Sequence, residues 1–126
     1  MKTVIHTKNA PAPIGPYSQA VIANGFLFVS GQVAINPENG EINLSSITEE
    51  THQVMRNVKA VLLEAGYAFE HVIKTTIFLS DMELFASVNE VYGAYFDGAY
   101  PARETVAVKG LPKGVNVEIS VTAFKG

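Results

Sequence analysis

Arg103 and Glu118 are the residues of this chain whose types and spacing best fit chemistry on a small acidic molecule. A planar guanidinium binds a carboxylate through two parallel hydrogen bonds and stays charged at any physiological pH. A carboxylate near the same cleft can position a water molecule and move its protons. The two residues therefore predict a pocket for a carboxylate-bearing ligand.

The segments that carry these residues alternate apolar and polar side chains, which is typical of half-buried strands. Residues 109–114 lie between them and contain the glycines and the proline that mark a turn. We predict a β-hairpin in which Thr105 faces Glu118 and Arg103 lies one step along on the same face. The resulting diagonal pair would have Cβ atoms about 7 to 8 Å apart.

Length and composition limit what such a site could belong to. The 126 residues form one domain over residues 1–126, large enough to bury about two-thirds of the unfolded surface without disulfides or metals. The absence of cysteine excludes thiolate catalysis and thiolate metal sites. A net charge of −3 with scattered lysines argues against nucleic acid as a partner.

The sequence also shapes expectations about location and assembly. No apolar run approaches the ~20 residues of a membrane span, and the N-terminus lacks a signal-peptide core, so we expect a cytoplasmic protein with no membrane partner. Apolar residues make up 48% of the chain and charged residues 17%, which favours an oligomer that buries surface between subunits. A tightly packed monomer could have the same composition.

The N-terminal part of the chain predicts three strands. Residues 2–7 alternate as a short strand, and the proline-rich segment after it excludes regular structure. Residues 18–23 and 26–31 flank Asn24-Gly25, the strongest short-range signal for a hairpin because both turn residues tolerate positive φ.

A helix is predicted from a capping box formed by Ser46 and Glu49, and it should run to about Ala65, with Gly66 as its C-terminal cap. Its apolar stripe comprises Val54, Val58, Val61, Leu62 and Ala65. One face of this helix should therefore pack on the sheet.

The second half of the chain repeats the pattern of strand and helix. Residues 72–79 are rich in β-branched side chains and predict a strand. Ser80 and Glu83 form a second capping box, which should open a helix that ends before Pro101. Its inward residues would be Leu84, Val88, Val91, Tyr92, Tyr95 and Phe96.

This order of elements predicts an α+β fold of two layers, with a mixed six-stranded sheet and two helices on one face. The other face of the sheet would be solvated or would form a subunit interface. The predicted hairpin places Arg103, Thr105, Glu118 and Ser120 on that second face.

Metal and nucleophile chemistry find no support in the sequence. His6, His52 and His71 are isolated, with no second ligand at i+2 to i+4. Neither Ser18 nor Ser30 lies in a nucleophile elbow, and no glycine motif could cradle phosphate. We expect neither a metal nor a cofactor.

Four segments in order carry a resemblance to a known family. They are residues 12–20 (APIGPYSQA), residues 28–32 (FVSGQ), residues 100–103 (YPAR), and Leu111-Pro112 with residues 117–119 (VEI). Their order and spacing over nearly the whole chain resemble the RidA (YjgF/YER057c/UK114) family. The resemblance implies a chorismate-mutase-like fold and a homotrimer with clefts between its subunits.

The resemblance also implies an activity. Similar proteins hydrolyse reactive enamines and imines such as 2-aminoacrylate and 2-iminobutyrate to 2-keto acids and ammonium, without a cofactor. On this sequence, Arg103 would bind the substrate carboxylate and Glu118 would orient or activate water. Tyr17, Ser30, Gly31 and Asn89 would line the cleft. Thr105 stands where many relatives have cysteine, so no thiol role is possible there and substrate preference could differ.

Each of these roles has a structural alternative. Arg103 could form an ion pair with Glu104 or Glu118, and Glu118 could be a solvated strand residue. Tyr17 and Ser30 could serve packing and hydrogen bonding alone. At the level of the whole protein, the alternatives are a holdase-type chaperone or a trimer that binds small keto acids, and then a single-strand ribonuclease, which the acidic balance disfavours.

Overall fold

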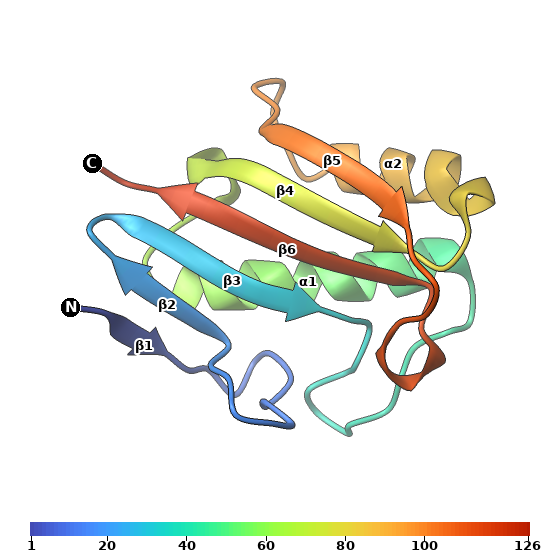
Figure 1. The fold of residues 1–126 in the computed structure, drawn as a ribbon, viewed down its shortest axis with the longest axis horizontal. Coiled ribbons are helices and arrows are strands. Elements are labelled where there is room, and N and C mark those ends of the chain that lie inside the picture. Colours follow the sequence, from blue (N-terminus) through green and yellow to red (C-terminus); the bar gives the residue numbers. More distant parts are fainter.

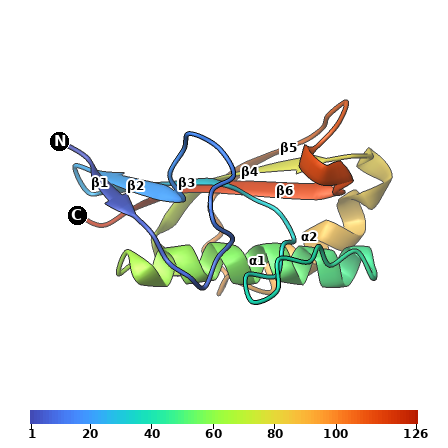
Figure 2. The same ribbon diagram turned by 90° about the horizontal axis from the view of Figure 1, so that it is seen from below.

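The computed structural model has six strands in one sheet and two α-helices that cover one of its faces (Figure 1). Seen edge-on, the helices form a layer of their own below the sheet (Figure 2). The elements are β1 (Thr3–Ile5), β2 (Ala20–Ala23), β3 (Phe26–Gln32), α1 (Ile47–Glu64), β4 (Val72–Leu79), α2 (Phe85–Gly93), β5 (Ala102–Ala107) and β6 (Val117–Phe124). The predicted α+β fold of two layers is confirmed.

The sheet has the strand order β1-β2-β3-β6-β4-β5, and it is mixed. Only β4 and β5 are parallel, and every other neighbouring pair is antiparallel. The hairpin between β2 and β3 turns at Asn24 and Gly25, whose φ angles of 52° and 84° are both left-handed, as a type I′ turn requires. This predicted hairpin is confirmed.

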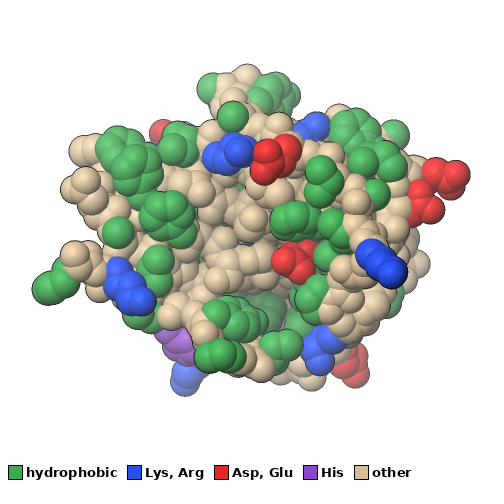
Figure 3. All heavy atoms as spheres, in the orientation of Figure 1, with side chains coloured by type: hydrophobic (Ala, Val, Ile, Leu, Met, Phe, Trp, Pro, Cys, Tyr) green, Lys and Arg blue, Asp and Glu red, His purple; other side chains and the backbone are tan.

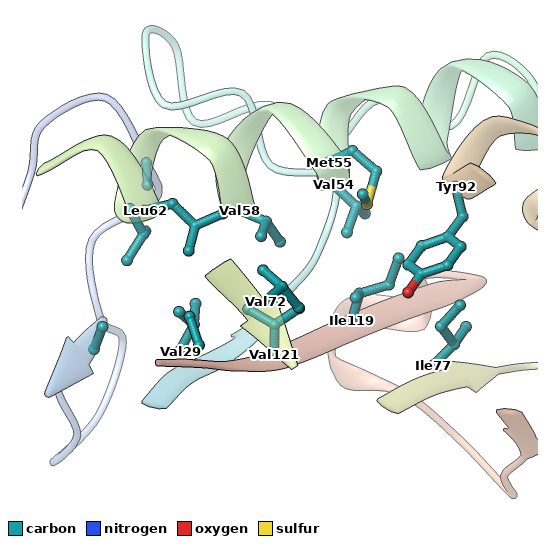
Figure 4. Packing of buried hydrophobic residues seen from close by; sticks show 14 of the residues in the cluster. Val29, Val54, Met55, Val58, Leu62, Val72, Ile77, Tyr92, Ile119 and Val121 are labelled. Atoms are coloured by element: carbon teal, nitrogen blue, oxygen red, sulfur yellow. The ribbon is translucent and has the colours of Figure 1, made fainter. Parts of the chain in front are cut away.

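Helix α1 begins and ends where the sequence indicated. The Ser46 hydroxyl accepts a hydrogen bond from the Glu49 backbone N–H at 3.1 Å, and the chain leaves the helix through Gly66 at φ 81°. Figure 4 shows Val58 and Leu62 of α1 pointing toward Val29 and Val121 of the sheet. The core therefore lies between α1, α2 and one sheet face. Neither helix combines the length and apolar character needed to cross a bilayer.

The start of the second helix differs from the prediction. Asp81, rather than Ser80, is the N-cap, and its carboxylate accepts the Glu83 N–H at 2.9 Å in a short 3₁₀ turn over Met82–Leu84. The Ser80 hydroxyl instead donates to Asn116 Oδ1 at 3.0 Å. Helix α2 then runs from Phe85 to Gly93 and ends well before Pro101.

The predicted hairpin between residues 100–108 and 115–121 is wrong. Strand β4 lies between β5 and β6, so Thr105 lies opposite Ile77, and Ile77 lies opposite Ile119. The cause is topological. Helix α2 carries the chain from β4 back to a parallel neighbour, a crossover that two strands joined by a helix require. Strand β6 then pairs with the other edge of β4.

The two predicted catalytic residues consequently lie on opposite faces of the sheet. Arg103 is paired with Thr75, which is fully buried toward the helices, and directly opposed residues share a face. Glu118 is paired with Phe78 on the open face. The expectation that Arg103 and Thr105 share the open face with Glu118 and Ser120 is therefore wrong, because it depended on the hairpin.

Candidate active site

A first hollow of about 680 Å³ lies where β5 begins beside α2. It is lined by Asn89, Glu90, Tyr92, Gly93, Tyr100, Pro101 and Arg103. Two predicted site residues, Arg103 and Asn89, therefore meet here. They come from different elements, the first from the edge strand β5 and the second from the middle of α2.

The Arg103 guanidinium is held by a hydrogen bond and by two aromatic rings, and it forms no ion pair with a carboxylate. Its Nη1 donates to Asn89 Oδ1 at 2.6 Å. Its Cζ lies 5.2 Å from the centroid of the Tyr92 ring and 5.5 Å from that of Phe85, within the range of cation–π attraction. A guanidinium has five N–H donors, and this arrangement uses one of them. The remaining donors are available to an anionic ligand.

The alternative in which Arg103 forms an ion pair with Glu104 or Glu118 is wrong. The one salt bridge in the structure joins Lys74 to Glu104 at 3.6 Å, and Glu104 also accepts the Thr76 hydroxyl at 3.0 Å. Both contacts are on the face opposite to the Arg103 side chain. Arg103 thus keeps its full charge without a carboxylate partner in the chain.

The Tyr92 ring, which lies against the Arg103 guanidinium, is itself held in place by a hydrogen bond. Its hydroxyl donates to Thr75 Oγ1 at 2.9 Å, and Figure 4 shows that hydroxyl pointing toward the sheet. Burial raises the pKa of the Tyr92 hydroxyl, against smaller opposing effects of Thr75 and Arg103. The ring therefore stays neutral and fixed under the cation.

A second hollow of about 380 Å³ opens on the other face of the sheet. It lies near the middle of the surface seen in Figure 3. Its lining residues are Pro11, Ala12, Ile14, Tyr17, Gln19, Ser30, Gly31, Gln32, Val33, Ile35, Pro112, Lys113 and Glu118. Four predicted site residues, Tyr17, Ser30, Gly31 and Glu118, are therefore brought together here.

Glu118 occupies space that a side chain at position 31 would need. A Cβ atom added to Gly31 would lie 2.8 Å from Glu118 Cδ and closer still to one carboxylate oxygen. Burial raises the pKa of the Glu118 carboxyl above its ordinary value of 4.5. A carboxyl group with a raised pKa exchanges protons more readily near neutral pH, which suits general acid–base work.

Ser30 and Tyr17 have different positions around this carboxyl. The Ser30 hydroxyl donates to the Ser18 carbonyl at 2.6 Å, and its backbone N–H donates to the Gln19 carbonyl at 2.9 Å. These two hydrogen bonds join β3 to Ser18 and Gln19, the residues that directly follow Tyr17. The Tyr17 side chain is half exposed at the rim, with only a long 3.4 Å contact from the Ile14 N–H to its hydroxyl.

Thr105 lines neither hollow. Its Oγ1 is buried and makes no hydrogen bond, which is the single such case among the side chains of the structure. The residue lies two positions after Arg103 on the same face of β5. A hydroxyl with no hydrogen bond therefore lies two positions from a guanidinium with no ion-pair partner, so this face of β5 has hydrogen-bonding capacity that packing does not use.

Sequence reasoning did not assign three residues to the site: Tyr92 and Lys113, which line the hollows, and Phe85, whose ring lies against the Arg103 guanidinium. Phe85 and Tyr92 stand four positions before and three positions after Asn89, so helical spacing alone places them on its face. Lys113 lies in the turn before β6 with a left-handed φ of 58°. Nothing in its local sequence indicated that this lysine would reach the Glu118 hollow.

Two of the three histidines, His52 and His71, make contacts away from both hollows. His52 Nδ1 lies 2.8 Å from the Tyr95 hydroxyl, and His71 Nδ1 accepts the Ala68 N–H at 2.9 Å. No three His, Asp or Glu side chains are grouped so that they could hold a metal ion.

The sequence and the fold of this chain are similar to those of known proteins. The family model described as Endoribonuclease L-PSP matches residues 7–125. The chain is 53% identical to a RutC family protein of Pyrococcus horikoshii, with 99% of each chain covered. It is 44% identical to the 2-iminobutanoate/2-iminopropanoate deaminase of Mus musculus, over 100% of this chain and 93% of that protein. A solved structure from Yersinia pestis, a protein of unknown function of the conserved Rid protein family, superimposes with a TM-score of 0.96 at 49% identity, covering 99% of this chain and 100% of the other.

Proposed function

Because this chain belongs to the Endoribonuclease L-PSP family, which includes the Rid proteins, we propose that it is a cofactor-independent 2-iminobutanoate/2-iminopropanoate deaminase. Its substrates are 2-imino acids and the enamines that tautomerise to them. Its products are the 2-keto acid and ammonium. Arg103 carries this proposal, because it is a preorganised guanidinium with no anionic partner in the chain.

Arg103 binds the substrate carboxylate. The hydrogen bond to Asn89 and the rings of Phe85 and Tyr92 hold the guanidinium in one orientation, so little side-chain entropy is lost when a ligand binds. A bidentate contact fixes the plane of the carboxylate, and with it the imine carbon next to it. The main task of the protein is to position the imine carbon and the water molecule, since a protonated imine is already electrophilic.

Glu118 handles the protons of the hydrolytic step. The water oxygen bonds to the imine carbon, one water proton passes to the Glu118 carboxylate, and the C=N π electrons move to nitrogen. Glu118 then returns this proton to the amino group of the carbinolamine. As the C–N bond breaks, its electron pair leaves with nitrogen as ammonia, and the Glu118 carboxylate takes the hydroxyl proton. Transfer of that proton to ammonia gives the keto acid and ammonium and restores the carboxylate. A carboxyl with a raised pKa suits both the uptake and the return of the proton.

A site that uses both residues needs two subunits. Arg103 and Glu118 open on opposite faces of the sheet in one chain, so one substrate cannot touch both within that chain. In the homotrimer we propose, the open sheet faces line the centre. The Arg103 hollow of one subunit then meets the Glu118 hollow of the next. Exposed apolar side chains such as Val4 of β1 and Phe28 of β3 supply surface for that assembly.

A ribonuclease is the second candidate, because the description of the matching family names one. The chain carries a net charge of −3 and only two arginines, and cleavage of single-stranded RNA usually uses a basic groove with stacking aromatic side chains. Arg103 has aromatic neighbours, yet it lies in a hollow beside Glu90 rather than in a basic groove. We therefore place deamination first.

The test is a coupled assay in which 2-aminoacrylate or 2-iminobutyrate is generated and keto-acid release is followed. The intact protein should accelerate release, Arg103→Ala should abolish the acceleration, and Arg56→Ala should retain it. Arg56 is the matched control because it is the other arginine and lies exposed on α1. No acceleration by the intact protein, or full activity in a well-folded Arg103→Ala variant, would overturn the proposal. Cleavage of a single-stranded RNA by the same samples would favour the second candidate.

A further inference from the structure

We infer that Glu50, a buried carboxylate on α1, is a positioning residue. It holds Glu118 in its hollow through hydrogen bonds to Asn116 and Val117, a set of contacts that we call the clasp. The functional part of this inference rests on the function proposed above, while its structural part does not. Glu50 lies on the helix side of the sheet and touches neither hollow. It therefore acts on the site only through the backbone that carries Glu118.

Glu50 is among the most buried side chains of the molecule, with 1% of its surface exposed, and it has no ion-pair partner. Its Oε2 accepts the backbone N–H of Asn116 at 2.7 Å and that of Val117 at 3.2 Å. Its Oε1 accepts the side-chain amide of Asn116 at 2.9 Å. Burying a charged group is costly unless it is hydrogen-bonded, so these three donors explain why the carboxylate can be there.

Asn116 is tied to a third element as well. Its Oδ1 accepts the Ser80 hydroxyl at 3.0 Å, and its carbonyl accepts the Ser80 N–H at 2.9 Å. Ser80 directly follows β4, so one asparagine joins the end of β4 to α1 at the point where β6 begins. In Figure 1 this start of β6 lies beside the N-terminal turns of α1.

The clasp controls the position of the Glu118 hollow because of where it lies in the chain. Asn116 is two residues before Glu118, a separation of about 7 Å in a strand, so displacement of one moves the other. The segment 108–116 also supplies Pro112 and Lys113 to the lining of the hollow. Its other end is fastened by the Val108 N–H, which donates to the Leu79 carbonyl at 2.8 Å.

A purely structural role would predict something different. Loss of a buried hydrogen bond lowers the melting temperature, but below that temperature it leaves the reacting groups where they were. A misplacement of about 1 Å in a catalytic group can cost roughly 100-fold in rate even when the protein remains folded. The distinguishing quantities are therefore the split between kcat and KM and the titration of Glu118 itself.

The test compares Glu50→Gln and Asn116→Ala with the intact chain at a temperature where all three are folded. We expect Glu50→Gln to lower kcat for imine hydrolysis about 10-fold, with KM changed less than about 2-fold because Arg103 is untouched. The Glu118 carboxyl, followed by carbon NMR, should titrate at a lower pH, since a carboxyl that leaves its hollow loses the burial that raises its pKa. Asn116→Ala keeps both backbone hydrogen bonds to Glu50 and should show the same changes at smaller size.

Leu62→Ala is the matched control, because it opens a cavity at the far end of α1 and lowers stability without touching the clasp. It should leave kcat and the Glu118 titration unchanged. The inference is overturned if Glu50→Gln and Asn116→Ala behave like Leu62→Ala. If Glu50→Gln does not fold, Asn116→Ala alone decides. If the intact chain shows no imine hydrolysis, the proposed function fails, while the NMR titration still tests the clasp.

Discussion

The side chains of Arg103 and Glu118 project from opposite faces of one sheet, and strand β4 lies between the strands that carry them. Each has its own hollow, formed on one side by α2 and on the other by the loops around β3 and β6. Neither hollow contains both Arg103 and Glu118. The mechanism proposed above, which uses both residues, would therefore need an assembly rather than a single chain as its catalytic unit.

Mixed assemblies should restore activity that each parent lacks. Arg103→Ala and Glu118→Gln chains, unfolded together and refolded as a 1:1 mixture, should regain about a quarter of wild-type sites, because in a symmetric ring of random composition that fraction of interfaces receives both intact residues. The measurement is imine hydrolysis before and after mixing. Refolding either parent with the double variant should restore none. An inactive mixture that has formed mixed oligomers would contradict a site shared between subunits.

Asn89→Ala should weaken substrate binding more than turnover. The hydrogen bond from Arg103 Nη1 to Asn89 Oδ1 is 2.6 Å long and involves a charged donor, a class that contributes about 1.5 to 3 kcal/mol. Its loss frees the guanidinium to sample other rotamers, so KM should rise about 10-fold with a smaller fall in kcat. Ser87→Ala, at an exposed position on the same helix, should behave like the intact chain. An unchanged KM in Asn89→Ala would remove Asn89 from the site.

Gly31→Ala should separate activity from stability. The added methyl group would occupy the place of the Glu118 carboxyl, but a carboxyl at the end of a flexible side chain can move aside. The φ angle of Gly31 is outside the left-handed region, so alanine brings no backbone strain. We expect a melting temperature close to that of the intact chain and a large loss of hydrolysis. Gly110→Ala, where a Cβ meets nothing, should retain both. Retained hydrolysis in Gly31→Ala would show that the carboxyl position does not matter.

Local signals in the sequence were enough for most elements of the fold. The Asn24-Gly25 turn, the Ser46 cap and the apolar stripe of α1 each depend on neighbouring residues, and each was predicted correctly. The second helix was predicted with its cap one residue too early, because Ser80 and Asp81 are both good caps and Ser80 is engaged by Asn116, which is distant in sequence.

The pairing of β5 and β6 could not be predicted from local signals. Alternation and a glycine-rich turn are equally compatible with two neighbouring strands and with two strands that enclose a third. The crossover through α2 makes β5 a parallel neighbour of β4, and β6 pairs with the other edge of β4, so that β4 lies between them. Residue type and spacing had singled out Arg103 and Glu118, and the family resemblance added Tyr17, Ser30, Gly31 and Asn89. The structure groups these six residues into two hollows, with Thr105 outside.

Glu118→Gln should stabilise the protein near neutral pH. Burial raises the pKa of this carboxyl in the folded chain, so the folded state binds more protons than the unfolded state at pH values above about 4.5. Stability therefore falls as pH rises through the interval between the two pKa values, and glutamine removes that loss. Thermal melts should show a higher melting temperature for the variant at pH 7 and a smaller difference at pH 4. Glu64→Gln, at an exposed position at the end of α1, is the control. A gain that is larger at pH 4 would contradict the sign.

Thr105→Val tests whether the buried Thr105 hydroxyl, which has no hydrogen-bond partner, contributes to substrate binding. Valine has nearly the shape of threonine, and a buried hydroxyl without a partner costs about 1 to 3 kcal/mol, so the variant should melt at a higher temperature. Thr76→Val should show no such gain, because the Thr76 hydroxyl already donates to Glu104. If the Thr105 hydroxyl meets the substrate beside Arg103, the gain in stability should come with a KM for the imine raised severalfold. A gain in stability with unchanged kinetics would exclude Thr105 from substrate binding, and a loss of stability would show that the hydroxyl finds its partner across a subunit interface.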